Sequence, residues 1–314
     1  MYIIEKQGLG GITARIVADS ISLQDGTRLT TFELEYPRFI HSEFMTHRAL
    51  SKNAASSRAI PVPAMLKHIA EFPQRPVSWG KNMPGMQAKE LLDPETYEKA
   101  VAVWDRGREQ ALAIAADLHQ LGVHKQIVNR RTEPDMQMKV VASGTDDGWA
   151  NFFWLRNHPD AQPEIQELAR VMFEAYNAAT PTVLVPGEWH LPYISIKRNM
   201  YNQQVFSDHN DTVLSLDDAR KVSASCCAQV SYRKLDDSLE KALDIYDKLV
   251  TSVPVHASPI EHQATPIDYI GIDLTGKWEP GVTHVTKEGH LYSGNFKSWI
   301  QNRQLVPNNA KKVF

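Results

Sequence analysis

Residues 46–58 bring an imidazole, an amide, several hydroxyls and three cationic side chains together in one short stretch of the chain. If a helix ends near Asn53, the hydroxyls that follow it and the guanidinium of Arg58 can converge with backbone N–H groups on a phosphate. The alternative is a polar helix and loop on the surface, which short motifs often prove to be. The stretch is therefore a candidate phosphate site, with solvated surface as the alternative.

Arg156 closes a second stretch, residues 151–156 (NFFWLR), which begins at Asn151 and is aromatic and apolar between these two polar ends. An arginine suits the stabilisation of negative charge on a substrate, because it stays protonated and can form two parallel hydrogen bonds. The alternative for Arg156 is a salt bridge at the end of a helix.

The order of residues in the first stretch resembles the motif R-H-R-x-x-S-x-N-E-x-S-x-R of flavin-dependent thymidylate synthases. The agreeing positions are His47, Arg48, Ser51, Asn53, Ser56 and Arg58. The chain departs from the motif at Thr46, where the family has Arg, and at Ala54, where the family has Glu. The resemblance implies that His47, Arg48 and Asn53 contact FAD. It also implies that Ser56, Ser57 and Arg58 hold the nucleotide phosphate.

The second stretch resembles a family segment with a short helix ending in Arg, then N-F-x-x-x-R and A-Q-x-E-I-Q. Asn129 and Arg130 compete for the first Arg position, and Arg130 is the predicted substrate ligand. The resemblance implies that Asn151 contacts the flavin. It implies that Arg156 is catalytic and bonds the edge of the pyrimidine, where it stabilises developing charge.

Two more family segments, A-R-V-S-F and H-x-T-P-F-E-H, precede the motif in the family but follow it in this chain. Residues 228–232 (AQVSY) resemble the first and residues 256–262 (HASPIEH) resemble the second. The residues that the resemblance places around the flavin are Ser231, His256, Ser258 and Glu261. This order indicates a circular permutation, which domains tolerate because their termini are often close together.

We therefore expect a circularly permuted α+β domain, with an antiparallel sheet and helices, that spans residues 1–314 as one unit. Its core segments are 14–180 and 215–265, and its additional loops and C-terminal extension are 181–214 and 266–314. Residues 295–303 (NFKSWIQNR) echo the aromatic, Gln and Arg content of the family helix before the motif. Arg303, with Gln301 beside it, is predicted to restore the cation lost at Thr46, with a peripheral surface helix as the alternative.

The resemblance implies conversion of dUMP to dTMP with 5,10-methylenetetrahydrofolate and NADPH, in which FAD relays the hydride and the one-carbon group. The departures at Thr46 and Ala54 leave dCMP as substrate, and hydroxymethyl transfer, as alternatives. A non-catalytic flavin- or nucleotide-binding relative is the alternative of a different class. The family builds each site from several subunits, which implies a homotetramer.

The sequence predicts neither a nucleophilic side chain nor a metal site. Cys226 and Cys227 lie in an apolar-faced helical pattern and are predicted to belong to the core. Ser56 has no evident base beside it, so a phosphate ligand is the preferred interpretation. The spacing of His256 and His262 is not that of a zinc protease. His190 is predicted to be a loop residue.

The composition is that of a soluble globular protein, with 42% hydrophobic and 23% charged residues. The net charge of −3 argues against nucleic acid or an anionic membrane as a partner. The N-terminus has no signal-like apolar stretch, no apolar run is long enough for a bilayer, and the two adjacent cysteines form no disulfide framework. These features predict a cytoplasmic protein.

The local patterns also predict the elements that position these residues. Alternation predicts strands at 14–22 and 29–36, with a turn at Asp25-Gly26 between them. Helical spacing, with Gly122 as a stop and Ser215 as a cap, predicts helices near 38–56, 62–71, 95–121, 123–131, 160–179, 215–230 and 237–252. The helix at 123–131 is expected to end before Pro134. Residues 180–214 are expected to be loose, and residues 266–294 to form strands and turns.

Overall fold

The computed structural model describes residues 4–230, 238–269 and 278–311. Its largest sheet has the strand order β1-β2-β3-β5-β4, and β6 pairs with β2 in parallel. The other pairs in this sheet are antiparallel. The strands are β1 (Glu5–Gln7), β2 (Thr13–Ser22), β3 (Arg28–Pro37), β4 (Ser51–Ala54), β5 (Gln137–Thr145) and β6 (Thr182–Leu184). An α+β fold with an antiparallel sheet is confirmed.

The hairpin of β2 and β3 confirms the two strands predicted from alternation. Gly26 in the connecting turn has φ of 74°, a backbone conformation that glycine adopts without steric cost. The Asp25 carboxylate accepts hydrogen bonds from the backbone N–H and the hydroxyl of Thr27, at 3.2 and 2.7 Å. The turn chemistry read from the sequence therefore fixes the register of the hairpin.

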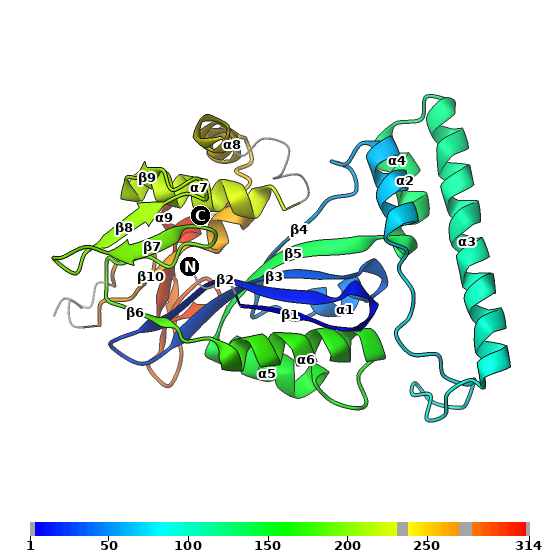
Figure 1. The fold of residues 1–314 in the computed structure, drawn as a ribbon. Helices are drawn as coiled ribbons and strands as arrows, with labels where there is room; N and C mark the ends of the chain where they lie inside the picture. The colour runs from blue at the N-terminus through cyan, green and yellow to red at the C-terminus, as the bar shows by residue number, and fades with distance from the viewer. Residues whose placement is uncertain (1–3, 231–237, 270–277, 312–314) are drawn as a thin grey trace.

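Two helices, α5 (Asp146–Arg156) and α6 (Pro163–Ala178), lie along one side of the sheet (Figure 1). Apolar side chains from these helices and from β2, β3 and β5 form the main hydrophobic core. Within it, Phe32 and Trp149 are fully buried and meet edge to face, with ring centroids 5.1 Å apart. Burial of this apolar stripe is what holds α5, and with it Arg156, against the sheet.

The chain that follows β6 lies mostly away from α5 and α6, on the other side of the sheet (Figure 1). Its helices are α7 (Leu216–Ala228), α8 (Leu239–Thr251), the 3-10 turn η5 (Ser258–Glu261) and α9 (Asn302–Leu305). Its strands after η5 are β10 (Ala264–Pro266), β11 (His284–Val285), β12 (Leu291–Ser293), β13 (Phe296–Lys297) and β14 (Trp299–Gln301). The predicted cap of α7 is confirmed, because the Ser215 hydroxyl accepts the Asp218 N–H at 3.1 Å.

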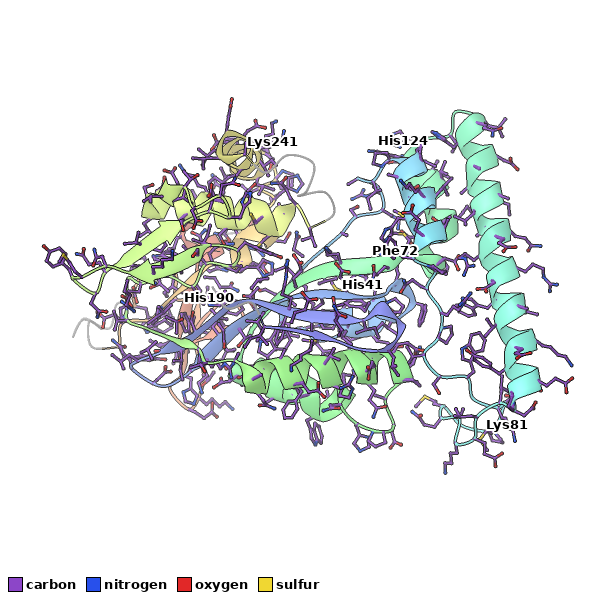
Figure 2. The ribbon with its side chains drawn as sticks, viewed as in Figure 1. His41, Phe72, Lys81, His124, His190 and Lys241 are labelled. Atoms are coloured by element: carbon purple, nitrogen blue, oxygen red, sulfur yellow. The ribbon has the colours of Figure 1, made fainter. Side chains whose placement is uncertain are left out.

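Three helices form an arm that projects beyond one end of the sheet (Figures 1 and 2). They are α2 (Val62–Glu71), α3 (Pro94–Gln120) and α4 (Lys125–Val128). The long helix predicted at 95–121 is confirmed, and Gly122 ends it with φ of 78°. Although α3 is the longest helix described, Ala115 is its only buried residue in the described structure. Apolar side chains of α3 such as Val103 and Ile114 are therefore exposed.

Other predicted elements were wrong. The helix expected over 38–56 is divided into η2 (Arg38–Ile40), α1 (His41–Met45), a turn, and β4. The helix expected near 123–131 stops early, and the 3-10 helix η3 (Asn129–Asp135) that follows contains Pro134. The region 181–214 includes β7 (Ser195–Arg198), β8 (Gln204–Ser207) and β9 (Val213–Leu214). Strand pairing and tertiary packing override the local pattern in each case.

No helix in the described part of the chain combines the length and apolar character needed to cross a membrane.

Trp299→Ala tests whether the C-terminal extension folds together with the central sheet. Trp299 is fully buried, packs with Leu29 and Leu184, and donates its indole N–H to the Thr27 carbonyl at 3.2 Å. We expect the free energy of unfolding to fall by about 3–5 kcal/mol, within a single urea transition followed by circular dichroism. Trp154→Ala, at a 75% exposed position, is the control and should cost about 0.5 kcal/mol or less. An early separate transition confined to the C-terminal segments would contradict the single unit.

Candidate active site

Strand β4 divides the motif residues between two faces of the sheet. It lies at the sheet edge, with Ser51 opposite Ser143 and Asn53 opposite Val141 on β5. Because side chains alternate along a strand, Ser51 and Asn53 share one face, whereas Lys52 and Ala54 share the other. Ala54 packs against the main core, and the Lys52 ammonium lies 5.8 Å from the centre of the Phe44 ring.

The face with Ser51 and Asn53 meets the segments that follow the motif in sequence. The Asn53 amide donates to the Cys227 carbonyl at 2.6 Å, and its oxygen accepts the Ser258 hydroxyl at 3.1 Å. Glu261 lies in the same 3-10 turn as Ser258. The structure therefore brings Asn53 into contact with the turn that carries Ser258 and Glu261.

The C-terminal extension fixes the motif turn through two side-chain amides. Asn295 donates to the Ala49 carbonyl at 2.8 Å and accepts the Ser51 hydroxyl at 3.1 Å. Gln301 donates both to Asn295 at 2.8 Å and to Ser51 at 3.2 Å. Gln301 was expected here from the sequence, whereas Asn295 was not. The only sequence signal for Asn295 was its place beside the aromatic and Arg residues of the tail.

Arg303 reaches the same region but contacts a different group from the one expected. Its guanidinium forms an ion pair with Glu261 and donates to the Asn309 carbonyl at 3.2 Å. Thr46 instead accepts a 3.4 Å hydrogen bond from Arg156 and donates to the Glu43 carbonyl at 2.7 Å. In the described structure the cation beside position 46 is thus Arg156. Arg303 instead pairs with Glu261, which was predicted to be a flavin ligand.

His47 and Arg156 are in direct contact. The Arg156 Nε–H donates to His47 Nε2 at 2.9 Å, and the imidazole meets the Phe152 ring edge to face at a centroid distance of 4.9 Å. Burial, followed by the charges of Arg156 and Lys52, lowers the pKa of His47 to about 4. His47 is therefore neutral at physiological pH.

Lys52 is a site residue that the sequence analysis did not predict. Its ammonium donates to the His47 carbonyl, and burial lowers its pKa to about 8 against the opposing effect of the Glu261 charge. The motif leaves its position unspecified, and only the alternation of β4 places the side chain beside His47. Lys52 and Arg156 give this face of β4 a positive character.

The predicted phosphate residues lie at the other end of the motif, around Glu133. The Glu133 carboxylate accepts hydrogen bonds from Ser57 and Arg130, both at 2.7 Å, and pairs with Arg38 at 3.2 Å. Neither Glu133 nor Arg38 was predicted as part of the site. Ser56 is half-buried and Arg58 is exposed in the adjoining turn.

Asn129, the competitor of Arg130, has a structural role. It is 1% exposed, and its amide donates to the Ser57 and Ile60 carbonyls at 2.7 and 3.0 Å. Asn129 therefore fixes the backbone at the end of the motif, from Ser57 to Ile60. Arg130 remains exposed and available to a ligand.

Several predicted residues are not joined to these clusters within the described chain. Arg48, Asn151 and His256 are exposed, and no hydrogen bond in the described structure links them to Asn53 or Ser258. Ser231 lies outside the described residues.

His190 lies between β6 and β7, outside the named strands, as predicted, but it is not a surface residue. It is fully buried beside the central sheet (Figure 2) and is joined to Ala264 by a β-bridge. Its ring nitrogens bond the Thr31 and Ser20 hydroxyls at 2.8 and 2.9 Å. Cys227 is buried and Cys226 half-buried, in keeping with the predicted core role.

A cavity of about 520 Å³ lies away from these clusters. Mainly apolar side chains, including Trp189, line it beside β2, β6 and the end of α6. None of the predicted site residues lines it. Among the described residues no group of three or more His, Cys, Asp or Glu is arranged to hold a metal ion.

One family model matches the part of the chain that carries residues 46–58. Residues 29–182, from β3 to the start of β6, match the family model described as thymidylate synthase complementing protein. The match covers just under half of the chain, and the similarity to that family applies to this segment. The matched segment contains the whole 46–58 motif as well as Asn151 and Arg156. The segments with Ser258 and Glu261 lie outside it.

Two solved structures are similar to the chain, and both are of a UMP/dUMP methylase, PolB, from Streptomyces cacaoi. The one bound with 5-Br UMP is 19% identical with a TM-score of 0.42, and the match covers 53% of this chain and 94% of that chain. The one bound with 5-Br dUMP is 21% identical with a TM-score of 0.40, covering 48% and 66%. At these values the likeness carries no functional argument. No curated protein matches the chain.

Asn295→Ala tests whether the C-terminal extension holds the motif turn. The substitution leaves the Ala49 carbonyl and the Ser51 hydroxyl without their partner, at an expected cost of about 1–3 kcal/mol. We expect faster backbone hydrogen exchange in peptides covering residues 46–51, measured by mass spectrometry. Asn210→Ala, at an exposed turn between β8 and β9, is the matched control. Unchanged exchange in residues 46–51 would show that the turn is stable without the hydrogen bonds from Asn295.

Proposed function

We propose that the protein transfers a one-carbon unit to C5 of a pyrimidine deoxynucleotide. The substrate is dUMP, the donor is 5,10-methylenetetrahydrofolate, the reductant is NADPH, and dTMP is the product. The observation that carries the proposal is the contact between Asn53 of the motif and Ser258, which are 205 positions apart. Two segments that resemble the same family meet at strand β4. The segment with Asn53 lies inside the matched region 29–182, and the segment with Ser258 lies outside it.

The same contact supports a circular permutation within a single domain of residues 1–314. Segment 258–261 packs on β4, and Asn53 bonds the end of α7. A segment placed before the motif in the family can occupy the same position after it, provided that the reconnected ends lie close.

The polar groups around β4 fit a bound FAD. Asn53 bonds Ser258, which shares a 3-10 turn with Glu261. Asn53 and Glu261 are half-buried and Ser258 is exposed, so they can offer donors and acceptors to the heteroatoms of a flavin ring. Arg48, Asn151, Ser231 and His256 are further proposed ligands. Bound FAD would supply hydride transfer, and the side chains would align the nucleotide with it.

Arg156 is the proposed catalytic residue. Its Nε–H donates to His47 and one terminal nitrogen donates to the Thr46 hydroxyl, which orients the guanidinium. The remaining terminal N–H groups can face a ligand. These donors can bond the pyrimidine edge and stabilise negative charge there, an effect of about 3 kcal/mol for one donor.

The nucleotide phosphate is assigned to Ser56, Ser57, Arg58 and Arg130. Ser57 and Arg130 now donate to Glu133, and a phosphate can replace this carboxylate as their acceptor. Arg58 supplies an exposed guanidinium in the same turn.

A homotetramer is part of the proposal. Exposed apolar side chains on the arm, among them Val103 at 56% and Ile127 at 55%, offer surface that an assembly would bury. An assembly also allows the separated Arg48 and Asn151 to complete a site with another subunit. Sedimentation of the purified protein would measure this directly, and a monomer at working concentration would refute it.

Mass spectrometry of the products from dUMP and from dCMP, each with methylenetetrahydrofolate and NADPH, tests the reaction. Methylated dUMP supports the proposal. A product from dCMP, or a hydroxymethyl product, would assign one of the alternatives left by Thr46 and Ala54. Nucleotide binding without any product would identify a non-catalytic relative.

The purified protein is expected to carry FAD or to take it up when FAD is added. The motivation is the convergence of Asn53, Ser258 and Glu261 on β4. Flavin absorbance of the desalted protein, and its bleaching by NADPH, measure this. Colourless protein that takes up no FAD would contradict the assignment.

Arg156→Ala is expected to lower kcat by about 100-fold or more, the loss typical of one preorganised donor. Flavin content should change much less, because the proposed flavin ligands Asn53 and Ser258 have no hydrogen bond to Arg156 in the described structure. Turnover and flavin content of the same preparation are compared. A parallel loss of both would indicate a structural role.

A further inference from the structure

The hydrogen bond between Arg156 and His47 determines where the imidazole carries its proton. A guanidinium stays protonated in proteins and has donors only. Since the Arg156 Nε–H points at His47 Nε2 at 2.9 Å, Nε2 must present its lone pair. A neutral imidazole with an unprotonated Nε2 carries its proton on Nδ1.

The groups that face His47 also oppose a second proton on the ring. Arg156 from α5 and Lys52 from β4 are both cationic, and the ring is 8% exposed. Phe152 contributes only an aromatic edge, at 4.9 Å between ring centroids. The nearest acid of α1, Glu43, interacts with the charge of Arg156. No carboxylate among the described residues forms an ion pair with the imidazole.

The Nδ1 side of the ring is available to a ligand. Contacts with Phe152 and Arg156 fix the ring plane from the α5 side. Lys52 bonds the backbone carbonyl of His47 and leaves the ring free. Within the described chain Nδ1 donates to no protein group.

We propose that Arg156 and Lys52 hold His47 as a neutral Nδ1–H hydrogen-bond donor to a carbonyl oxygen of the bound pyrimidine or flavin. Arg156 sets the tautomer, and Lys52 helps to keep the ring uncharged. His47 is therefore a positioning donor that neither takes up nor releases a proton in turnover. The identity of the ligand rests on the proposed function, whereas the tautomer does not.

Nitrogen-15 NMR of the ligand-free protein tests the tautomer. The His47 signals, assigned by their loss in His47→Asn, should show Nδ1–H and remain unchanged from about pH 5 to about pH 8, because the pKa of His47 lies near 4. Arg156→Met should allow Nε2–H to appear and raise the pKa. Lys52→Met should raise the pKa and keep Nδ1–H. An Nε2–H signal in the unsubstituted protein, or titration near the ordinary histidine pKa, overturns the proposal.

Paired substitutions test the donor. The side-chain nitrogen of Asn lies near the position of Nδ1, whereas a Gln amide reaches the position of Nε2. We expect His47→Asn to bind within about threefold of the unsubstituted protein and His47→Gln to bind about tenfold more weakly, the effect of one lost hydrogen bond. Circular dichroism confirms that both variants fold.

Titrations with FAD alone and with dUMP alone distinguish the two sources of the carbonyl, since only the ligand bonded by Nδ1–H loses affinity in the Gln variant. Equal affinities of the Asn and Gln variants for both ligands overturn the donor role. If the unsubstituted protein binds neither FAD nor dUMP, the proposed function fails. The NMR result still decides the tautomer in that case.

Discussion

The alternation of side chains along β4 is the constraint on which the arrangement of the site depends. One short edge strand sends Ser51 and Asn53 toward the C-terminal segments and Lys52 toward His47. The motif therefore serves two polar clusters at once, one on each face of the sheet. A shift of one residue in the pairing with β5 would exchange the two sets of side chains and dismantle both clusters.

A buried row of hydroxyls and histidines joins the sheet to the C-terminal segments that cover the face carrying Ser51 and Asn53. The hydroxyl oxygens of Thr31 and Ser143 lie 2.6 Å apart. The Ser143 hydroxyl also bonds His262 Nδ1 at 2.8 Å, and the Thr31 hydroxyl also bonds His190 Nε2. Both histidines are fully buried, and burial lowers the pKa of each to about 3. They act as neutral hydrogen-bonding groups, because a charge there would lose its hydration without gaining a partner. The same row aligns β5 and its neighbour Ser51 with the C-terminal extension.

The opposite face of β4, which carries Lys52, holds positive charge that nearby carboxylates neutralise only in part. Lys52 and Arg156 flank His47, while Glu261 is already paired with Arg303 from the chain's own tail. Thr46 stands where the resembled motif has Arg, and this region still carries positive charge because Arg156 bonds the threonine hydroxyl. Partly buried cations of this kind favour an anionic or carbonyl-bearing ligand, and they keep the imidazole between them neutral.

The sequence by itself determined the elements with a strong local period, such as the hairpin of β2 and β3 and the long helix α3, and the order of the family motif. It also placed Ser258 and Glu261 with the motif, although their roles as ligands stay predictions. Only the tertiary structure decided that 51–54 is a strand, that Asn295 and Lys52 join the site, and that His190 is buried. Periodicity and turn chemistry act between near neighbours, so they can be read along the chain. Strand pairing, and hydrogen bonds such as that from Asn295 to Ala49, join residues far apart in sequence, and their partners exist only once the chain has folded.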